Sequence, residues 1–226
     1  YTVQEFLYNV RMPVFFVLSG IFLNASLKKN GRGLIFKKKA ANLLYPYIIW
    51  SVFLISLQLI FSAYTNSDRT ARDFLYIFLK PRELDHMWYL LALFNTTILY
   101  LLLAPLFERN KFMNLLLAVL LHFASFYLGP WSFFFDISYH YVFLVSGVIV
   151  SDHIYKWESV TIKKNLILLL LVAPLFIAGQ LFWLRSIGKD YQSEYWWQLG
   201  PYLLIIMVAC FVFYLVSRLF EAWGKM

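Results

Sequence analysis

The stretch VRMPVFFVLSGIFL, residues 10–23, is apolar enough to lie in a membrane, although an arginine leads it and a proline stands inside it. A bilayer core about 30 Å thick takes about 20 mostly apolar residues in one helix, and residues 6–27 provide such a run. We therefore expect a membrane-spanning helix here. Arg11 and Pro13 need a separate reason, because a charge inside hydrocarbon is costly and proline removes one backbone hydrogen bond from a helix.

The whole chain has the composition of an integral membrane protein. Its 226 residues are 62% hydrophobic and 14% charged, whereas soluble domains are about 45–50% apolar and about 25% charged. Aromatic residues make up 21% of the chain, which is more than one soluble core of this size would bury. The single cysteine, Cys210, excludes an internal disulfide and is expected to serve plain helix packing.

Seven stretches are long or nearly long enough to span a bilayer, which predicts an all-α, polytopic bundle of about seven transmembrane helices. Backbone groups in lipid must bond within the protein, and these uninterrupted runs are too long for barrel strands. The fifth stretch is expected to be the weakest, because Asp136 and His140 interrupt it. The predicted spans are 6–27, 42–64, 87–107, 112–128, 131–151, 165–184 and 196–217.

The charges between the predicted spans indicate the orientation. Loops of odd number are net positive and loops of even number are not. Because cytoplasmic loops are enriched in Lys and Arg, residues 28–39 are predicted to be cytoplasmic and Tyr1 external. An external start without a signal peptide implies a helix upstream, so we expect a piece of a longer protein. The first loop is wholly basic, with Lys28, Lys29, Arg32, Lys37, Lys38 and Lys39.

A short pattern occurs twice. FVLSG at 16–20 is echoed by FLVSG at 143–147, in each case late in a predicted span. The echo is either a weak internal repeat or a coincidence in an apolar chain. In both cases the Ser-Gly pair would let another helix approach closely.

Four segments carry a resemblance to a known family. RMPVFFVLSGIFL (11–23), KKKAANLLYPYIIWS (37–51) and HMWYLLALF (86–94) occur in this order, followed by YHYVFLVSGVIV (139–150). In this arrangement the chain resembles the membrane acyltransferase-3 family, and within it the fucose 4-O-acetylase-like branch. The resemblance extends over residues 1–226, as a partial domain from which the family's first helix and last helices are missing.

The resemblance implies an enzyme that takes an acyl group, usually acetyl, from coenzyme A at the cytoplasmic side and places it on a sugar hydroxyl of a glycan. It implies a bacterial inner membrane, with acyl-CoA as a substrate rather than a bound cofactor. A functional histidine would lie upstream of Tyr1. The acceptor glycan and the acyl group are not named by the sequence.

Arg11 and the lysines are candidate ligands of the two substrates. Arg11 either extends to the outer membrane interface or faces a central cavity, holding an acceptor or an acyl carbonyl as a catalytic group. Lys37, Lys38 and Lys39 would attract the phosphates of coenzyme A at the membrane surface. The alternative for the lysines is orientation of the chain and attraction to anionic lipid.

Four further residues are candidates on the acceptor side. His86 is a candidate catalytic base, because an imidazole can take a proton from a hydroxyl and return it. Trp88 offers a flat face to a sugar ring, or else belongs to the interfacial aromatic belt. Asp136 and His140 stand four residues apart, so on a helix they share one face and are candidate substrate-binding residues. Their alternatives are an exposed helix end and a packing histidine.

Other function classes have weaker support. The chain has no phosphate loop and no Gly-x-Gly-x-x-Gly, His-Glu-x-x-His or Gly-x-Ser-x-Gly motif, and it suggests neither a metal site nor nucleic-acid binding. The rival hypothesis is a transporter or flippase-like carrier of a lipid or glycan, which would use the same basic and polar residues without transfer chemistry. A truncated, inert scaffold is the third.

Overall fold

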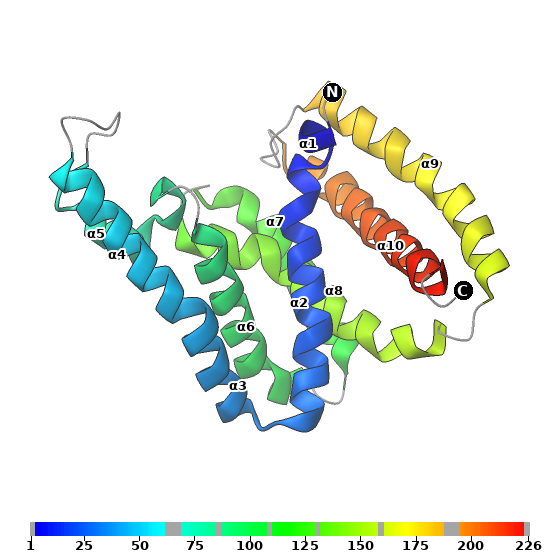
Figure 1. The fold of residues 1–226 in the computed structure, drawn as a ribbon, viewed down its shortest axis with the longest axis horizontal. Coiled ribbons are helices and arrows are strands. Elements are labelled where there is room, and N and C mark those ends of the chain that lie inside the picture. The colour runs from blue at the N-terminus through cyan, green and yellow to red at the C-terminus, as the bar shows by residue number, and fades with distance from the viewer. Residues whose placement is uncertain are drawn as a thin grey trace. The chain divides into compact units, whose positions relative to one another are not determined.

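The computed structural model describes residues 3–61, 69–84, 87–107, 110–129, 132–157, 161–187 and 195–223. Over these ranges the chain forms helices and their connections, without a strand (Figure 1). The chain divides into two compact units, Tyr1–Phe22 with Ser146–Met226 and Leu23–Val145.

The first unit consists of long helices, the short helix α1 and one 3-10 turn. Its helices α9 and α10 pack against each other along their length (Figure 1). The short helix α1 contacts α9. The elements with residues in this unit are α1 (Val3–Phe6), α2 (Tyr8–Lys29), α8 (Phe133–Trp157), α9 (Ile162–Ser186), the 3-10 turn η5 (Trp196–Gln198) and α10 (Leu199–Trp223).

The second unit contains the remaining helices, and α2 and α8 contribute residues to it as well. A core of Tyr47, Ile55, Ile77 and Leu91 holds three of its helices together. Its other elements are α3 (Arg32–Lys39), the π-helical segment η1 (Ala40–Leu44), α4 (Tyr45–Ile60), α5 (Asp73–Leu79), the 3-10 turn η3 (Pro81–Leu84), α6 (Trp88–Phe107), α7 (Lys111–Ala124) and the 3-10 turn η4 (Ser125–Tyr127).

Six helices of the described residues are long and apolar enough to cross a membrane, so the prediction of an all-α, polytopic bundle is confirmed. The number of spans is lower than the seven predicted, because the fourth predicted span is the shorter apolar helix Lys111–Tyr127. The six are Tyr8–Lys29, Arg32–Ile60, Trp88–Phe107, Phe133–Ile154, Ile162–Ser186 and Trp196–Glu221.

The fifth predicted span has, together with Tyr8–Lys29, the lowest hydropathy of the six helices, but its polar residues do not interrupt the helix as predicted. Its counterpart α8 is one continuous helix of 25 residues. Asp136 and His140 do not interrupt it, because both are buried, with exposed fractions of 2% and 1%, and both have partners inside the protein. A polar side chain weakens a membrane helix when it meets lipid, which neither of these does.

The basic segment is also more ordered than predicted. Residues 32–39 form the helix α3, which continues through η1 into α4, so the cations stand on a helix rather than in a loop. The π segment has a local cause. Pro46 cannot donate to the carbonyl four residues before it, and in the turn just before Pro46 the N–H of Tyr45 donates to Ala40, five residues back.

Pro13 leaves a carbonyl in α2 that the first unit satisfies from another helix. Having no N–H, Pro13 cannot donate to the carbonyl of Asn9, and the hydroxyl of Tyr202 donates to that oxygen instead, at 2.8 Å. The chain also leaves helical geometry at Leu7, between α1 and α2, and here too a side chain from another helix donates to a backbone carbonyl. Nε2 of Gln180 donates to the carbonyl of Phe6 and to Oδ1 of Asn9, both at 2.6 Å. Tyr202 and Gln180 thus tie the bent start of α2 to α10 and α9.

Helices α2 and α8 approach closely at Gly147. A methyl group at Gly147 would lie 2.8 Å from the carbonyl carbon of Val17, and closer still to its oxygen, so only glycine fits there. Gly147 ends the second copy of the repeated pattern and Val17 belongs to the first copy. The predicted close approach at a Ser-Gly pair is therefore confirmed for the second copy.

Candidate functional site

A buried ion pair lies inside the second unit, between the turn η3 and helix α8. Nε of Arg82 donates to Oδ1 of Asp136 at 2.7 Å, and one terminal guanidinium nitrogen of Arg82 lies 2.6 Å from the same oxygen. The side chains are 5% and 2% exposed. Ionised side chains that are this deeply buried are costly unless they are paired, and perturbed buried charges cluster at functional sites, so this pair is the centre of the candidate site.

Two candidate residues from the sequence lie around the pair. The guanidinium carbon of Arg82 stands 4.2 Å from the ring centroid of Trp88, which begins helix α6. The ring centroids of Trp88 and His140 are 5.6 Å apart. The fold therefore brings together Trp88, Asp136 and His140, which the sequence had suggested as substrate-binding residues, and it adds Arg82 to them.

The relation between Asp136 and His140 differs from the expected side-chain pair. Nδ1 of His140 lies 2.9 Å from the backbone carbonyl oxygen of Asp136, whereas the Asp136 carboxylate meets Arg82. A carbonyl only accepts hydrogen bonds, so Nδ1 carries the hydrogen and Nε2 is the basic nitrogen of the neutral ring. The i, i+4 spacing therefore orients the imidazole through a backbone carbonyl, and it does not pair the imidazole with the Asp136 carboxylate.

One oxygen of the Asp136 carboxylate, Oδ2, could accept further hydrogen bonds. Oδ2 is buried, and no hydrogen bond reaches it within the part of the chain that the structure describes. An ionised carboxylate has about four lone-pair sites and can only accept. A hydroxyl group that entered this region would find an acceptor atom ready for it.

Arg82 is the functional candidate that the sequence did not reveal. In the sequence it counts only as one charge of a neutral loop, and no periodic pattern or motif marks it. The available signal is indirect. A carboxylate within a predicted span needs a cation or several donors, and few basic residues stand close to the start of a neighbouring span.

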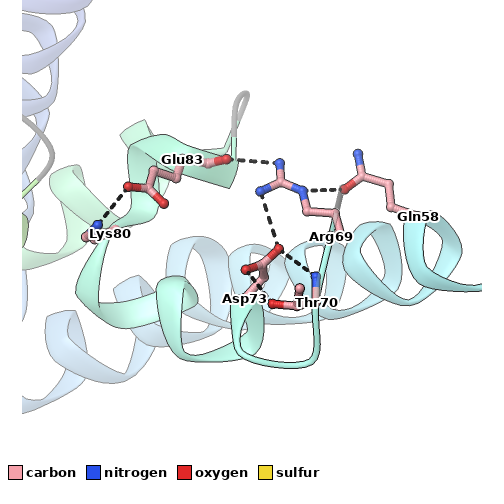
Figure 2. Close-up of polar contacts among 6 residues, drawn as sticks. All are labelled: Gln58, Arg69, Thr70, Asp73, Lys80 and Glu83. Carbon is pink, nitrogen blue, oxygen red and sulfur yellow. Dashed lines mark hydrogen bonds and ion pairs between the residues drawn. The ribbon is translucent and has the colours of Figure 1, made fainter. Parts of the chain in front are cut away.

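The turn that carries Arg82 is held by an arginine clamp, which we define as Gln58, Arg69, Asp73 and the carbonyl of Glu83 (Figure 2). Nε of Arg69 donates to Oε1 of Gln58 at 3.0 Å, and a terminal nitrogen donates to the carbonyl of Glu83, also at 3.0 Å. The other terminal nitrogen lies 3.9 Å from Oδ2 of Asp73. One guanidinium therefore joins the end of α4, the start of α5 and the turn η3.

The candidate lysines occupy the last turn of α3, also in the second unit. Lys37 and Lys38 are exposed and Lys39 is half-buried. Successive helical residues point about 100° apart, so these three cations cover more than one side of the helix. The ring of Phe36 lies 6.2 Å from that of Phe94, which anchors the basic helix on α6.

The structure does not relate the two candidate catalytic residues to the site described above. Arg11 is exposed in the first unit, and its guanidinium carbon lies 5.1 Å from the ring centroid of Tyr8. His86 falls outside the described residues. The clustering of Trp88, Asp136 and His140 therefore stands without either of them.

The helices define the class of protein, and comparison with known families defines it further. Several apolar helices long enough to cross a bilayer make this an integral membrane protein. The family model Acyl_transf_3, described as an acyltransferase domain, matches residues 1–225, so the chain belongs to this family and has the domain of a membrane acyltransferase. No curated protein and no solved structure matches the chain.

Proposed function

We propose that this chain belongs to a membrane O-acyltransferase that moves an acyl group, acetyl in the first instance, from acyl-CoA to a sugar hydroxyl of a glycan or glycolipid. The observation that carries the proposal is the unsatisfied Oδ2 of Asp136 beside Arg82, Trp88 and His140, in a chain of the acyltransferase family. The fucose 4-O-acetylase-like branch and a bacterial inner membrane belong to the same proposal.

The acceptor would bind at the ion pair. A sugar offers hydroxyl donors for Oδ2 of Asp136 and an apolar ring face for Trp88. Arg82 holds the Asp136 carboxylate through Oδ1, which leaves Oδ2 to the substrate.

The donor would bind at the other end of the same helical segment. Lys39 and Gln58 are separated by 19 residues of the continuous segment Arg32–Ile60, which is roughly 28 Å at about 1.5 Å per residue. The lysines and the arginine clamp therefore stand near opposite ends of a membrane span. This separation supports a donor phosphate site on the cytoplasmic side, residues 28–39, and an acceptor site on the outer side.

The transfer step needs one base and one leaving group. The hydroxyl oxygen of the acceptor attacks the thioester carbonyl carbon, and its proton passes to an imidazole, for which His86 is the candidate. The carbon–sulfur bond then breaks, and the coenzyme A thiolate leaves and is protonated. Arg11 is the candidate for holding the acyl carbonyl. Fixing two reactants in this way can lower a barrier by about 7–11 kcal/mol.

The test follows label from acetyl-CoA into membrane glycan, with the full-length protein reconstituted in vesicles. A Lys37→Ala/Lys38→Ala/Lys39→Ala variant should raise the KM for acetyl-CoA roughly tenfold or more, because clustered charge concentrates an anionic ligand. The matched control is Lys163→Ala/Lys164→Ala, which removes exposed cations at the start of α9.

The outcomes separate the parts of the proposal. Wild-type protein that transfers no label to any glycan contradicts the acyltransferase assignment. Transfer with an unchanged KM for acetyl-CoA in the lysine variant, measured at limiting donor, removes the lysines from the donor site and leaves the reaction in place. Asp136→Asn should lower kcat/KM for the acceptor without changing the KM for acetyl-CoA.

A further inference from the structure

We propose that Arg69 is a positioning residue for the acceptor site, because it holds the turn that presents Arg82 to Asp136. This inference rests on the proposed function. Arg69 touches none of the site residues itself; it acts through the backbone of η3.

The first step is the position of the carbonyl that Arg69 binds. Arg69 donates to the carbonyl of Glu83, one residue after Arg82, within a 3-10 turn of four residues. A turn this short has few hydrogen bonds of its own. A shift of the Glu83 carbonyl therefore moves the neighbouring Arg82, whose hydrogen bond of 2.7 Å and ion-pair contact of 2.6 Å to Asp136 leave little tolerance.

The second step is that Arg69 is itself fixed from two other elements. Gln58 accepts from its Nε on α4, and Asp73 faces it from α5. The Asp73 carboxylate is held in turn, since Oδ2 accepts from the backbone N–H of Thr70 at 3.1 Å and Oδ1 from its hydroxyl at 3.4 Å. These two bonds fix the Asp73 side chain at the first residue of α5.

The third step is the low exposure of the clamp. The side chains of Arg69 and Asp73 are 15% and 10% exposed, and the planar guanidinium donates two hydrogen bonds in fixed directions and faces the Asp73 carboxylate at 3.9 Å. Exposed ion pairs contribute little because water screens them, whereas a shielded guanidinium fork gives both strength and direction. Lysine at this position could not reach three acceptors on three elements.

A neighbouring ion pair provides the contrast. Lys80 Nζ lies 3.0 Å from Oε1 of Glu83, with side-chain exposures of 47% and 30% (Figure 2). The hydrogen bond and charge of Glu83 raise the pKa of Lys80 above its usual value. This pair uses the Glu83 side chain and not its carbonyl, so its removal leaves the clamp in place.

The experiment compares Arg69→Gln with Lys80→Gln in full-length protein, using the same labelled acetyl transfer. Each variant removes one cation from the same short segment. We expect Arg69→Gln to lower kcat/KM for the acceptor by about ten- to a hundredfold, as expected for a displacement on the order of 1 Å in a catalytic site. The KM for acetyl-CoA should not change, and Lys80→Gln should resemble wild type.

A second variant guards against a misfolded protein. Gln58→Met removes one of the three partners of Arg69 and retains the guanidinium, so it should show a smaller loss in the same parameter. A purely structural role would lower the amount of folded protein, and hence kcat for both substrates alike, with both KM values unchanged.

The outcomes distinguish the two proposals. If wild-type protein transfers acetyl and Arg69→Gln matches Lys80→Gln, the positioning role is wrong and the proposed function stands. If folded Arg69→Gln and Gln58→Met lose kcat without a change specific to the acceptor, the role is also wrong. If wild-type protein transfers nothing, the proposed function and this inference both fail.

Discussion

Removing the buried ion pair one side at a time, and then entirely, gives a sharp test of the structure of the site. The variants are Arg82→Met, Asp136→Leu and the double variant, in full-length protein. Methionine keeps an unbranched chain against Trp88, and leucine is close to aspartate in size. Each single change leaves one ion behind in a region where the two partners are 5% and 2% exposed.

The magnitude follows from burial and distance. With N···O distances of 2.6 and 2.7 Å, the charge centres stand about 4 Å apart, which is worth about 4 kcal/mol at an effective dielectric constant of about 20. Removing one partner of a buried pair costs about 3–5 kcal/mol, while replacing both with apolar residues is often neutral or stabilising. The two single variants should therefore be unstable, and the double variant close to wild type.

Thermal unfolding of the purified protein in mild detergent measures this, with the coupling energy taken from the double-mutant cycle. For a chain of this size each kcal/mol shifts the Tm by about 2–4 °C, so we expect single losses of about 6–20 °C. The double variant should recover most of that loss and still fail to acylate the acceptor. Single variants within about 3 °C of wild type, or a double variant whose loss equals the sum of the two, would refute the burial argument.

Two further predictions concern the first unit and use the same unfolding assay. Gly147→Ala should lower the free energy of unfolding by about 1–3 kcal/mol, because its methyl group meets a backbone carbonyl. The control Gly33→Ala, which would place nothing within 4 Å of its Cβ, should leave the stability unchanged or raise it slightly. Equal Tm values for the two variants would disprove the close helix approach. Tyr202→Phe should cost about 1–3 kcal/mol by leaving the Asn9 carbonyl without its donor. Adding Pro13→Ala, which supplies a helical N–H to that carbonyl, should reduce this cost, and strict additivity of the two changes would contradict our account.

The fold class was predictable from the sequence because membrane helices are set by length and hydropathy, which are local properties. The predicted spans 6–27 and 87–107 agree with α2 and α6 to within a few residues. The errors arose where tertiary context overrides local signals. The polar residues of α8 are hidden by the protein, and the basic segment continues an apolar helix that lies after it.

The site was predictable only in part, for a related physical reason. Trp88, Asp136 and His140 are marked by residue type within apolar runs, so the sequence identifies them as unusual. Arg82 stands in a polar loop where arginine is ordinary, and its distance of 54 residues along the chain from Asp136 hides the pairing. The role of Arg69 depends on a backbone carbonyl, which has no signature in a sequence.

Buried tyrosine hydroxyls and the buried Asp136 carboxylate differ in which partners can satisfy them. Tyr47 and Tyr202 are donors that satisfy backbone carbonyls, at 2.5 and 2.8 Å. In such a bond the hydroxyl has an acceptor and the carbonyl has a donor, so no further partner is needed. A carboxylate cannot be satisfied in this way, since carbonyls do not donate and helical N–H groups are already used. Asp136 therefore depends on Arg82 through Oδ1, whereas Oδ2 has no hydrogen-bond partner among the described residues. Under the proposed function, a hydroxyl of the acceptor would donate to this oxygen.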